Sequence, residues 1–280
     1  MQEKHSIMQR MPTCGIIIGK VNMEEINKIK KVAEEAAREA GGYALEHIDK
    51  IASISHKGGY TNLVTDVDKK CESIILGRIS KEFPEHSILA EESGEHASTS
   101  SIKWLIDPLD GTTNYAHGFP IFCTSIGVSF DSVIKVGVIY DPTRDELFAA
   151  EEGKGAFLNG KKISVSSREA LRDSLIATGF AYDLERKAAN MDAFKIMLEN
   201  AQAVRRAGSA AIDLCYVACG RFDGFWEMGL NPWDTAAGQL IVKEAGGIVT
   251  TTKGEPFDVY KKHILATNSK IHEEMLNLLK

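Results

Sequence analysis

Apolar positions along the chain follow either the period of a helix or the pattern of a strand. Segments of these two kinds succeed one another from residue 22 to the C-terminus. The first helical pattern begins at Asn22, whose spacing to Glu25 fits a capping box, and passes two adjacent glycines toward Ile51. A second helical pattern occupies 68–83 and stops before Pro84. Further helices are predicted over 210–220, over 233–247 and at the C-terminus.

Short runs of β-branched and apolar residues predict strands, and several strands follow one another without a helix between them. These runs occupy 87–90, 103–106, 124–130, 133–140, 147–150, 174–179, 222–228, 247–251 and 263–268. The Asn159-Gly160 pair predicts a hairpin, because these residues favour the positive φ angles of a type I′ turn. The mixture predicts an α/β chain of the α+β type, with mixed sheets layered with helices, rather than a Rossmann fold or an eight-fold barrel.

The composition narrows the class of protein. A chain of 280 residues with 44% hydrophobic residues can bury the core of one large α/β domain or of two packed halves. Its net charge of -6 gives no general attraction to nucleic acid or to an anionic membrane. We therefore expect a small-molecule partner.

Two further features concern location and boundaries. The five cysteines are scattered and never spaced C-x-x-C, so they predict reduced thiols rather than a disulfide framework or a zinc ribbon. No apolar run approaches the roughly 18 residues of a membrane span, and the cytoplasm is the expected location. Residues 1–22 match no periodic template and are expected to form a poorly ordered extension before one domain over 23–280.

The stretch WLIDPLDGTTNYAHGFP, residues 104–120, carries the strongest chemical signal. Asp107 follows a predicted buried strand, where ligands of open α/β sheets usually lie, and Pro108 is expected to end the strand. Asp110 would then project to the same side, and Gly111 would let the backbone approach a ligand. Thr112 is expected to open a helix. The alternative is that these residues are only turn formers, although a turn needs neither two acids nor two threonines.

Other acids stand at similar positions. Glu91 ends a short strand, Asp234 stands where a helix begins and could be its N-cap, and Asp68 has the same ambiguity. Carboxylates that converged on one cleft would repel by about 4 kcal/mol per pair at 4 Å and an effective dielectric of 20, so cations must offset the repulsion. Oxygen-only ligands select hard ions such as Mg²⁺ or Mn²⁺. The pattern indicates metal-assisted transfer of a phosphoryl group to water.

Two aspartates three apart suit a pair of metals about 3.5 to 4 Å apart, one lowering the pKa of a water and the other stabilising the leaving oxygen. A threonine at the same turn could hold that water. The letters LDGTT also resemble the D-x-D-G-T motif of haloacid-dehalogenase-type phosphatases. There the first aspartate forms a phosphoenzyme, and here that position is Pro108, so the covalent mechanism has no nucleophile.

Taken together, these segments resemble the magnesium-dependent, lithium-sensitive inositol monophosphatases. DPLDGTTNYAHGFP and WDTAAGQLIVKEAGG match two long signatures of that family, and AEESG, KGGYTNLVTDVD, GKGAFLNGKKISVS and RRAGSAAIDLCYVACGRFDGFWE fit in the family's order. The resemblance extends from about Met23 to the C-terminus. It implies a catalytic domain over 23–280 with a layered αβαβα sugar-phosphatase sandwich, usually as a homodimer.

The resemblance also implies roles for single residues. The ligands of a first metal would be Glu91, Asp107 and the Leu109 carbonyl, and those of a second would be Asp107, Asp110 and Asp234, with a third, weaker metal near Glu91. Thr112, paired with Asp68, would activate the attacking water together with Glu91, and the Gly111 and Thr112 N–H groups would hold phosphate beside Asp110. Glu227 and the Ser209-Ala210 segment would bind substrate hydroxyls, and Lys57 resembles a lysine of a mobile catalytic loop.

Several alternatives stay open. Glu227 could be a strand-edge acid, Arg205 and Arg206 are as consistent with surface charges as with ligands, and Tyr115 and Trp104 are expected to pack. The expected reaction is Mg²⁺-dependent hydrolysis of myo-inositol 1-phosphate, without a phosphoenzyme. Alternative substrates are fructose 1,6-bisphosphate, alone or as a dual activity, histidinol phosphate and 3′-phosphoadenosine 5′-phosphate. A non-catalytic regulatory protein is disfavoured because every expected ligand is present, and a dehydrogenase because no G-x-G-x-x-G follows a strand.

Overall fold

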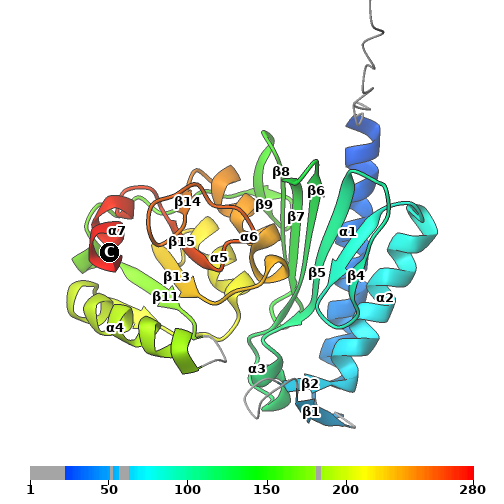
Figure 1. Cartoon of the computed structure of the whole chain (residues 1–280), viewed down its shortest axis with the longest axis horizontal. Helices are drawn as coiled ribbons and strands as arrows, with labels where there is room; N and C mark the ends of the chain where they lie inside the picture. Colours follow the sequence, from blue (N-terminus) through cyan, green and yellow to red (C-terminus); the bar gives the residue numbers. More distant parts are fainter. Residues whose placement is uncertain (1–22, 51–52, 57–62, 181–183) are drawn as a thin grey trace, which may run out of the picture.

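The computed structural model describes residues 23–50, 53–56, 63–180 and 184–280, and they form five layers (Figure 1). Helices α1 (Met23–His47) and α2 (Asp66–Glu82) cover the outer face of an eight-stranded sheet. Helices α5 (Ala210–Ala218) and α6 (Pro232–Glu244) lie between that sheet and a five-stranded one. Helices α4 (Leu184–Asn200) and α7 (His272–Leu279) cover the far side. This αβαβα order confirms the predicted fold class.

Both large sheets are mixed. The first has the order β10-β9-β8-β7-β6-β5-β3-β4, in which only β3 and β5 run parallel. Its strands, in chain order from β3 to β10, are Ser87–Ala90, Gly94–His96, Ile102–Asp110, Cys123–Phe130, Val133–Asp141, Glu146–Glu151, Gly155–Leu158 and Lys161–Lys162. The second has the order β12-β11-β13-β15-β14, with strands β11 to β15 at Leu175–Thr178, Ala203–Arg205, Gly224–Met228, Ile248–Thr250 and His263–Thr267. A separate hairpin pairs β1 (Ile54–His56) with β2 (Leu63–Thr65).

Most predicted elements are confirmed, including the hairpin at Asn159 and Gly160, whose φ angles are 47° and 75°. The first helix does pass its adjacent glycines, but it ends at His47 rather than near Ile51. Gly41 has a packing reason, because a Cβ there would lie 2.7 Å from the Tyr140 ring on β7. Asn22, the expected start of the helix, lies outside the described residues.

Helix α4 was not predicted. Its apolar residues form no continuous stripe, and a buried polar residue, Asn190, lies where a helical pattern would place an apolar one. The Trp226 indole N–H on β13 donates to Asn190 Oδ1 at 2.8 Å, so the asparagine is satisfied inside the layer. The short strands β1, β2, β4 and β12 and the 3₁₀ turn Leu171–Asp173 were also missed.

Three apolar clusters fill the spaces between layers, one under α1 and α2, one around α5 and α6, and one beneath α4 and α7. Helix α6 lies close to the eight-stranded sheet because β6 and β7 present Gly127 and Gly137 to it. A Cβ on Gly127 would meet the Ala236 side chain, and one on Gly137 would lie 2.7 Å from the Ala237 carbonyl oxygen. This contact fixes the start of α6, where Asp234 stands.

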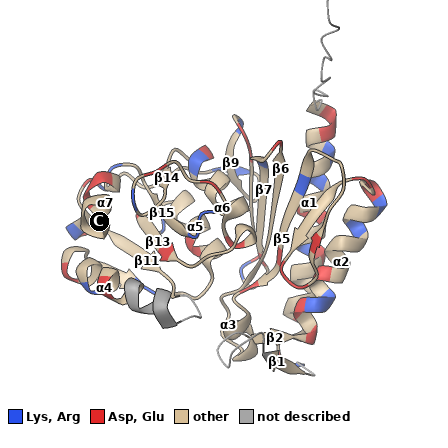
Figure 2. Ribbon diagram, viewed as in Figure 1, with Lys and Arg blue, Asp and Glu red and all other residues tan. Residues whose placement is uncertain are grey.

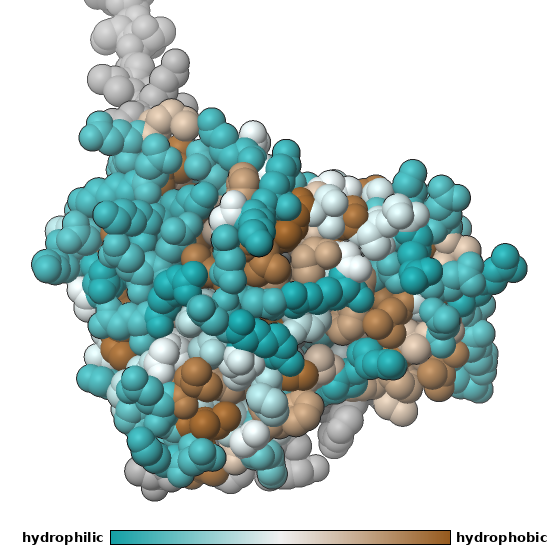
Figure 3. Space-filling view, turned by 180° about the vertical axis from the view of Figure 1, so that it is seen from behind, coloured by the Kyte–Doolittle hydropathy of each residue, from teal (hydrophilic) through white to brown (hydrophobic). Residues whose placement is uncertain are grey.

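The surface is predominantly polar. Lysines and arginines alternate with acids along α1 and α2 (Figure 2), and on the reverse face apolar side chains show as separate patches among hydrophilic ones (Figure 3). Among the described helices, none has the length and apolar character needed to cross a membrane. Of the described cysteines, Cys71, Cys123 and Cys215 are buried, Cys219 is partly buried, and all four are free thiols.

Candidate active site

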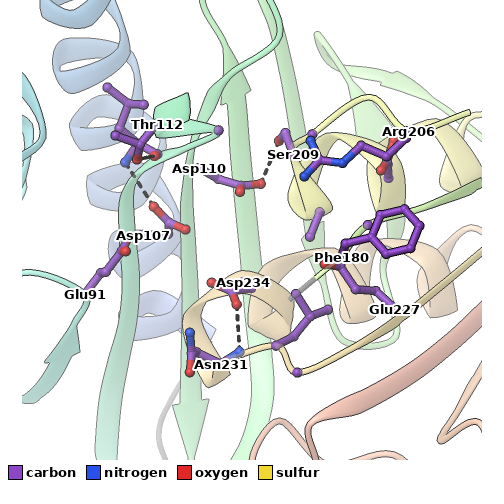
Figure 4. Close-up of a pocket in the computed structure, with 18 residues that line it drawn as sticks. Glu91, Asp107, Asp110, Thr112, Phe180, Arg206, Ser209, Glu227, Asn231 and Asp234 are labelled. Carbon is purple, nitrogen blue, oxygen red and sulfur yellow. Dashed lines mark hydrogen bonds between the residues drawn. The ribbon is translucent and has the colours of Figure 1, made fainter. Parts of the chain in front are cut away.

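A pocket of about 130 Å³ opens between the two large sheets, and it gathers residues from five segments of the chain (Figure 4). Ten of the predicted site residues line it: Glu91, Asp107, Leu109, Asp110, Gly111, Thr112, Ser209, Ala210, Glu227 and Asp234. Asp68 lies behind Thr112. Lys57, predicted on a mobile loop, lies outside the described residues.

The two aspartates of the first signature lie on a strand rather than on the turn that the sequence predicts. Strand β5 continues through Pro108 to Asp110, with a register shift against β6 between Asp107 and Asp110. The expectation that proline ends the strand was wrong, because a β-bulge tolerates a residue without an N–H. The Pro108 carbonyl accepts from Thr124 Oγ1 at 3.0 Å, and Leu109 N–H donates to Asp107 Oδ1 at 3.0 Å.

Immediately after this strand the chain turns into helix α3 (Thr112–Ala116), as predicted. Gly111 takes φ 98°, a conformation that an L-residue rarely adopts, and a Cβ there would lie 2.8 Å from the Ile121 carbonyl oxygen. The glycine therefore lets the backbone turn directly from Asp110 to Thr112. As a result, the end of β5 and the first turn of α3 line the same pocket.

Thr112 and Asp68 are joined by a hydrogen bond, and Asp68 also caps a helix. The Thr112 hydroxyl donates to Asp68 Oδ1 at 2.9 Å and lies 3.1 Å from the Leu109 carbonyl oxygen. Asp68 Oδ2 accepts from the Thr65 N–H at 2.9 Å, which completes the capping box of α2. Capping and pairing with Thr112 thus use different oxygens of one carboxyl group. Burial raises the pKa of Asp68, which makes its carboxylate a stronger base.

Asp234 was considered as an N-cap, and the structure corrects this. The N-cap of α6 is Asn231, and Asp234 is the third helical residue of its capping box, with Oδ2 accepting from Asn231 N–H at 2.7 Å. Pro232 at the first helical position fits the same helix start. No hydrogen bond to Asp234 Oδ1 is found within the described chain, so this oxygen is free to bind a ligand.

Asp110 is held from the opposite side of the pocket. Its Oδ2 accepts from Ser209 Oγ at 2.6 Å and from the Ala211 N–H at 2.7 Å, at the first turn of α5. Ser209 is also the N-cap of α5, because its hydroxyl accepts from Ile212 N–H at 3.3 Å. The Ser209-Ala210 segment, predicted to face substrate, therefore also orients a predicted metal ligand.

Crowding of acids changes their protonation. Burial, followed by the neighbouring carboxyl groups, raises the pKa of Asp107 well above its usual value. Burial also raises the pKa of Asp234 well above its usual value and that of Asp110 to about 6. Without a bound cation, the protein therefore favours the protonated form of these three acids more than water does.

The donor set fits a hard cation. Every predicted ligand atom is an oxygen, and a bound cation would offset the repulsion that raises the three pKa values. Within the described ranges, no three His, Cys, Asp or Glu side chains lie close enough together to hold a metal ion by themselves. Mg²⁺ typically takes one or two carboxylates and completes its shell with water and phosphate, so it does not need three such side chains.

Away from Glu91 and Asp107, the pocket is lined by an acid and a base, Glu227 and Arg206. Glu227 lies on β13, where it pairs with Ile264 of β15, while the pairing of β13 with β11 ends at Trp226. Burial raises the pKa of Glu227 to about 8. Arg206 lines the pocket, whereas Arg205 lines a separate groove. Tyr115 and Trp104 are buried, as expected, and the Tyr115 hydroxyl donates to the Ala44 carbonyl.

Several lining residues were not predicted from the sequence, of which Phe180, Asp213, Leu230 and Asn231 bear side chains. Asp213 had a recognisable signal, because it is the only charged residue in the apolar segment AAIDLCYVA of α5. A lone acid on a buried helix needs a partner or a function. Phe180 gave no such signal.

Comparison with known proteins identifies the family of the chain. A family model described as "Inositol monophosphatase family" matches residues 25–280. A Synechocystis sp. protein named inositol-1-monophosphatase is 48% identical over 251 residues, which cover 89% of this chain and 88% of that protein. A Haemophilus influenzae protein named Nus factor SuhB is 41% identical, covering 91% of this chain and 97% of that one. The structure of inositol monophosphatase from Anabaena (Nostoc) sp. superposes with a TM-score of 0.82 and 44% identity, covering 91% and 96% of the two chains.

The fold, the gathered acids and these similarities lead to one assignment: the chain belongs to the inositol monophosphatase family and is a phosphoric monoester hydrolase.

Proposed function

We propose that the protein hydrolyses myo-inositol 1-phosphate to myo-inositol and phosphate in a Mg²⁺-dependent reaction. The observation that carries the proposal is the convergence of Glu91, Asp107, Asp110 and Asp234 on one pocket, next to the hydrogen-bonded pair of Thr112 and Asp68. The family is generally metal-dependent, and the name of the Synechocystis relative supports the substrate.

The metal ligands follow from the donor set. Glu91, Asp107 and the Leu109 carbonyl would hold one Mg²⁺, and Asp107, Asp110 and Asp234 a second. A third, weaker ion would lie near Glu91, and Mn²⁺ would substitute. Bound there, Mg²⁺ would supply positive charge to the phosphate and lower the pKa of the attacking water.

The chain's own groups would position the water and take its proton. Because the Thr112 hydroxyl donates to Asp68, its oxygen keeps lone pairs that can accept a hydrogen bond from a water. The proton would then pass toward Asp68, with Glu91 assisting. The Gly111 and Thr112 N–H groups would hold phosphate. A proline at 108 leaves no carboxylate for a phosphoenzyme, which supports direct attack by water.

Glu227 and the Ser209-Ala210 segment line the pocket, and their polar groups support the proposal of a hydroxylated leaving group. Fructose 1,6-bisphosphate, histidinol phosphate and 3′-phosphoadenosine 5′-phosphate remain alternatives on the same fold. The presence of the Thr112 and Asp68 pair supports turnover over a purely regulatory role. A cytoplasmic location, lithium inhibition and a homodimer are further parts of the proposal, as is the absence of nucleic-acid and membrane partners.

The test measures initial rates of phosphate release, with saturating Mg²⁺, from inositol 1-phosphate and from the three alternative substrates. We expect a preference for inositol 1-phosphate that is lost in Asp110→Asn. The matched control is Asp141→Asn, which changes a buried acid that hydrogen-bonds within its own turn at Thr143 and should keep the rate. Preference for another substrate would overturn the substrate, and full activity of Asp110→Asn would overturn the metal site.

A further inference from the structure

Besides the predicted metal ligands and Glu227, the pocket holds a further acid whose role is unassigned. Asp213, on the first turn of α5, is 1% exposed and lines the pocket. Its Oδ1 has no hydrogen-bond partner, and no hydrogen bond acts on its carboxyl group within the part of the chain that the structure describes. An acid buried in this way costs free energy unless a partner arrives with a ligand.

Asp213 is close enough to Glu227 for their charges to interact, and Glu227 is 8% exposed. Within the described chain no hydrogen bond to the Glu227 carboxyl group is found either. Figure 4 shows Glu227, Phe180 and Arg206 on the side of the pocket away from Glu91 and Asp107. Two unpartnered carboxyl groups therefore line the pocket, and Glu227 lies on the side away from Glu91 and Asp107.

The surrounding chain leaves room for these groups. Glu227 lies directly over Gly179, and any side chain at that position would collide with its carboxyl group. Gly208 likewise leaves space for the guanidinium group of Arg206, because a Cβ at position 208 would lie 2.6 Å from Arg206 Nη1. The space for Glu227 and Arg206 thus depends on two residues without side chains.

We propose that Asp213 is a specificity-determining residue that, together with Glu227, hydrogen-bonds hydroxyl groups of a polyol leaving group. This inference rests on the proposed function, because it concerns the alcohol part of the same phosphate ester. Two neighbouring carboxyl groups match two neighbouring hydroxyl groups, each of which can donate to an acid oxygen. An aromatic leaving group without hydroxyls would gain nothing from Asp213.

The test compares kcat and KM for inositol 1-phosphate, p-nitrophenyl phosphate and phosphoethanolamine in the wild type, Asp213→Ala and Asp213→Asn. We expect Asp213→Ala to lower kcat/KM for inositol 1-phosphate about 10- to 100-fold, the effect of one hydrogen bond to a charged group. Turnover of p-nitrophenyl phosphate should stay within about twofold, and Asp213→Asn, which keeps an acceptor oxygen, should recover part of the loss.

Thermal unfolding separates recognition from a structural role. Because Asp213 lacks partners, Asp213→Ala should leave the Tm of the ligand-free protein unchanged or higher. The matched control is Asp223→Ala, which removes a buried acid that accepts from Leu175 N–H at 2.7 Å and should lower Tm without changing the substrate ratio.

Each result has one meaning. A fall in both activities with a lower Tm in Asp213→Ala would show a structural role and overturn the inference. An unchanged ratio of the two activities would overturn it while leaving the proposed function intact, and a preference for phosphoethanolamine would replace the polyol with a cationic leaving group. A wild type that releases no phosphate from any of the three would overturn the proposed function itself.

Discussion

The Thr112 hydroxyl donates a 2.9 Å hydrogen bond to Asp68, which lies 44 residues earlier in the chain. Asp68 is held in place by the capping box of α2, and Thr112 by the turn at Gly111. The threonine is 7% exposed and the aspartate is buried. The pair is therefore fixed by two helix starts rather than by a loop, which suits a group that must orient a water.

Removing the hydroxyl should abolish water activation without unfolding the protein. Thr112→Val keeps the shape of the side chain, and we expect kcat to fall about 10²- to 10⁴-fold with little change in KM. Thr112→Ser restores the hydroxyl and should recover most of the rate. Equal loss in both variants, measured by steady-state kinetics, would contradict the role of the hydroxyl.

Capping and metal binding can be separated at Asp234. Asp234→Asn keeps an oxygen for the Asn231 N–H, so Tm should change little, whereas Asp234→Ala should also lose about 1 kcal/mol of unfolding free energy with the cap. Both should lower phosphate release by at least about 100-fold, because asparagine supplies only a neutral ligand and alanine supplies none. Retained activity in Asp234→Asn would remove this residue from the metal site.

The metal-free protein should become less stable as pH rises. Burial raises the pKa of Glu227 from 4.5 to about 8, so the folded state binds a proton that the unfolded state releases. The contribution of Glu227 to the free energy of unfolding is complete below about pH 4.5 and is lost as the pH rises to about 8. The loss between pH 6 and pH 9 amounts to about 2–3 kcal/mol.

The measurement is Tm against pH in EDTA. The difference in Tm between pH 6 and pH 9 should be smaller in Glu227→Gln than in the wild type. The expected reduction is about 4–12 °C, because each kcal/mol shifts Tm by about 2–4 °C. Saturating Mg²⁺ should flatten the profile as well, because the ion favours ionised acids such as Asp110, whose pKa is raised to about 6. A profile that rises with pH in EDTA would contradict the protonated state of Glu227.

The close packing of α6 against β6 and β7 should affect Mg²⁺ binding, because α6 carries Asp234. Gly137→Ala places a methyl group 2.7 Å from the Ala237 carbonyl oxygen, so α6 must move. We expect a cost of about 1–3 kcal/mol in unfolding free energy and a higher Mg²⁺ concentration for half-maximal activity. Gly77→Ala on α2, where the added methyl meets nothing within 4 Å, is the matched control and should be neutral or stabilising.

The sequence predicts the site better than the local geometry that builds it. Asp107 and Asp110 stand out because they follow a predicted buried strand, and Asp234 because it stands where a helix begins. The layered fold follows from runs of strands between helices. The bulge at Pro108 was not predicted, because proline usually ends a strand and only the pairing of β5 with β6 shows that the ladder continues. Asp213 is visible in the sequence as the lone acid of an apolar helix, but its lack of a hydrogen-bond partner is a property of tertiary packing.

The central claim is that these acids act through Mg²⁺, and a metal titration tests it most directly. The measurement is phosphate release from inositol 1-phosphate by EDTA-treated enzyme as Mg²⁺ is added back, for the wild type and Asp107→Asn. We predict no activity in EDTA, saturable recovery in the wild type and at least a 100-fold lower rate in Asp107→Asn at every Mg²⁺ concentration, about the effect of one catalytic electrostatic group. Full activity in EDTA, or equal recovery in the variant, would contradict the account.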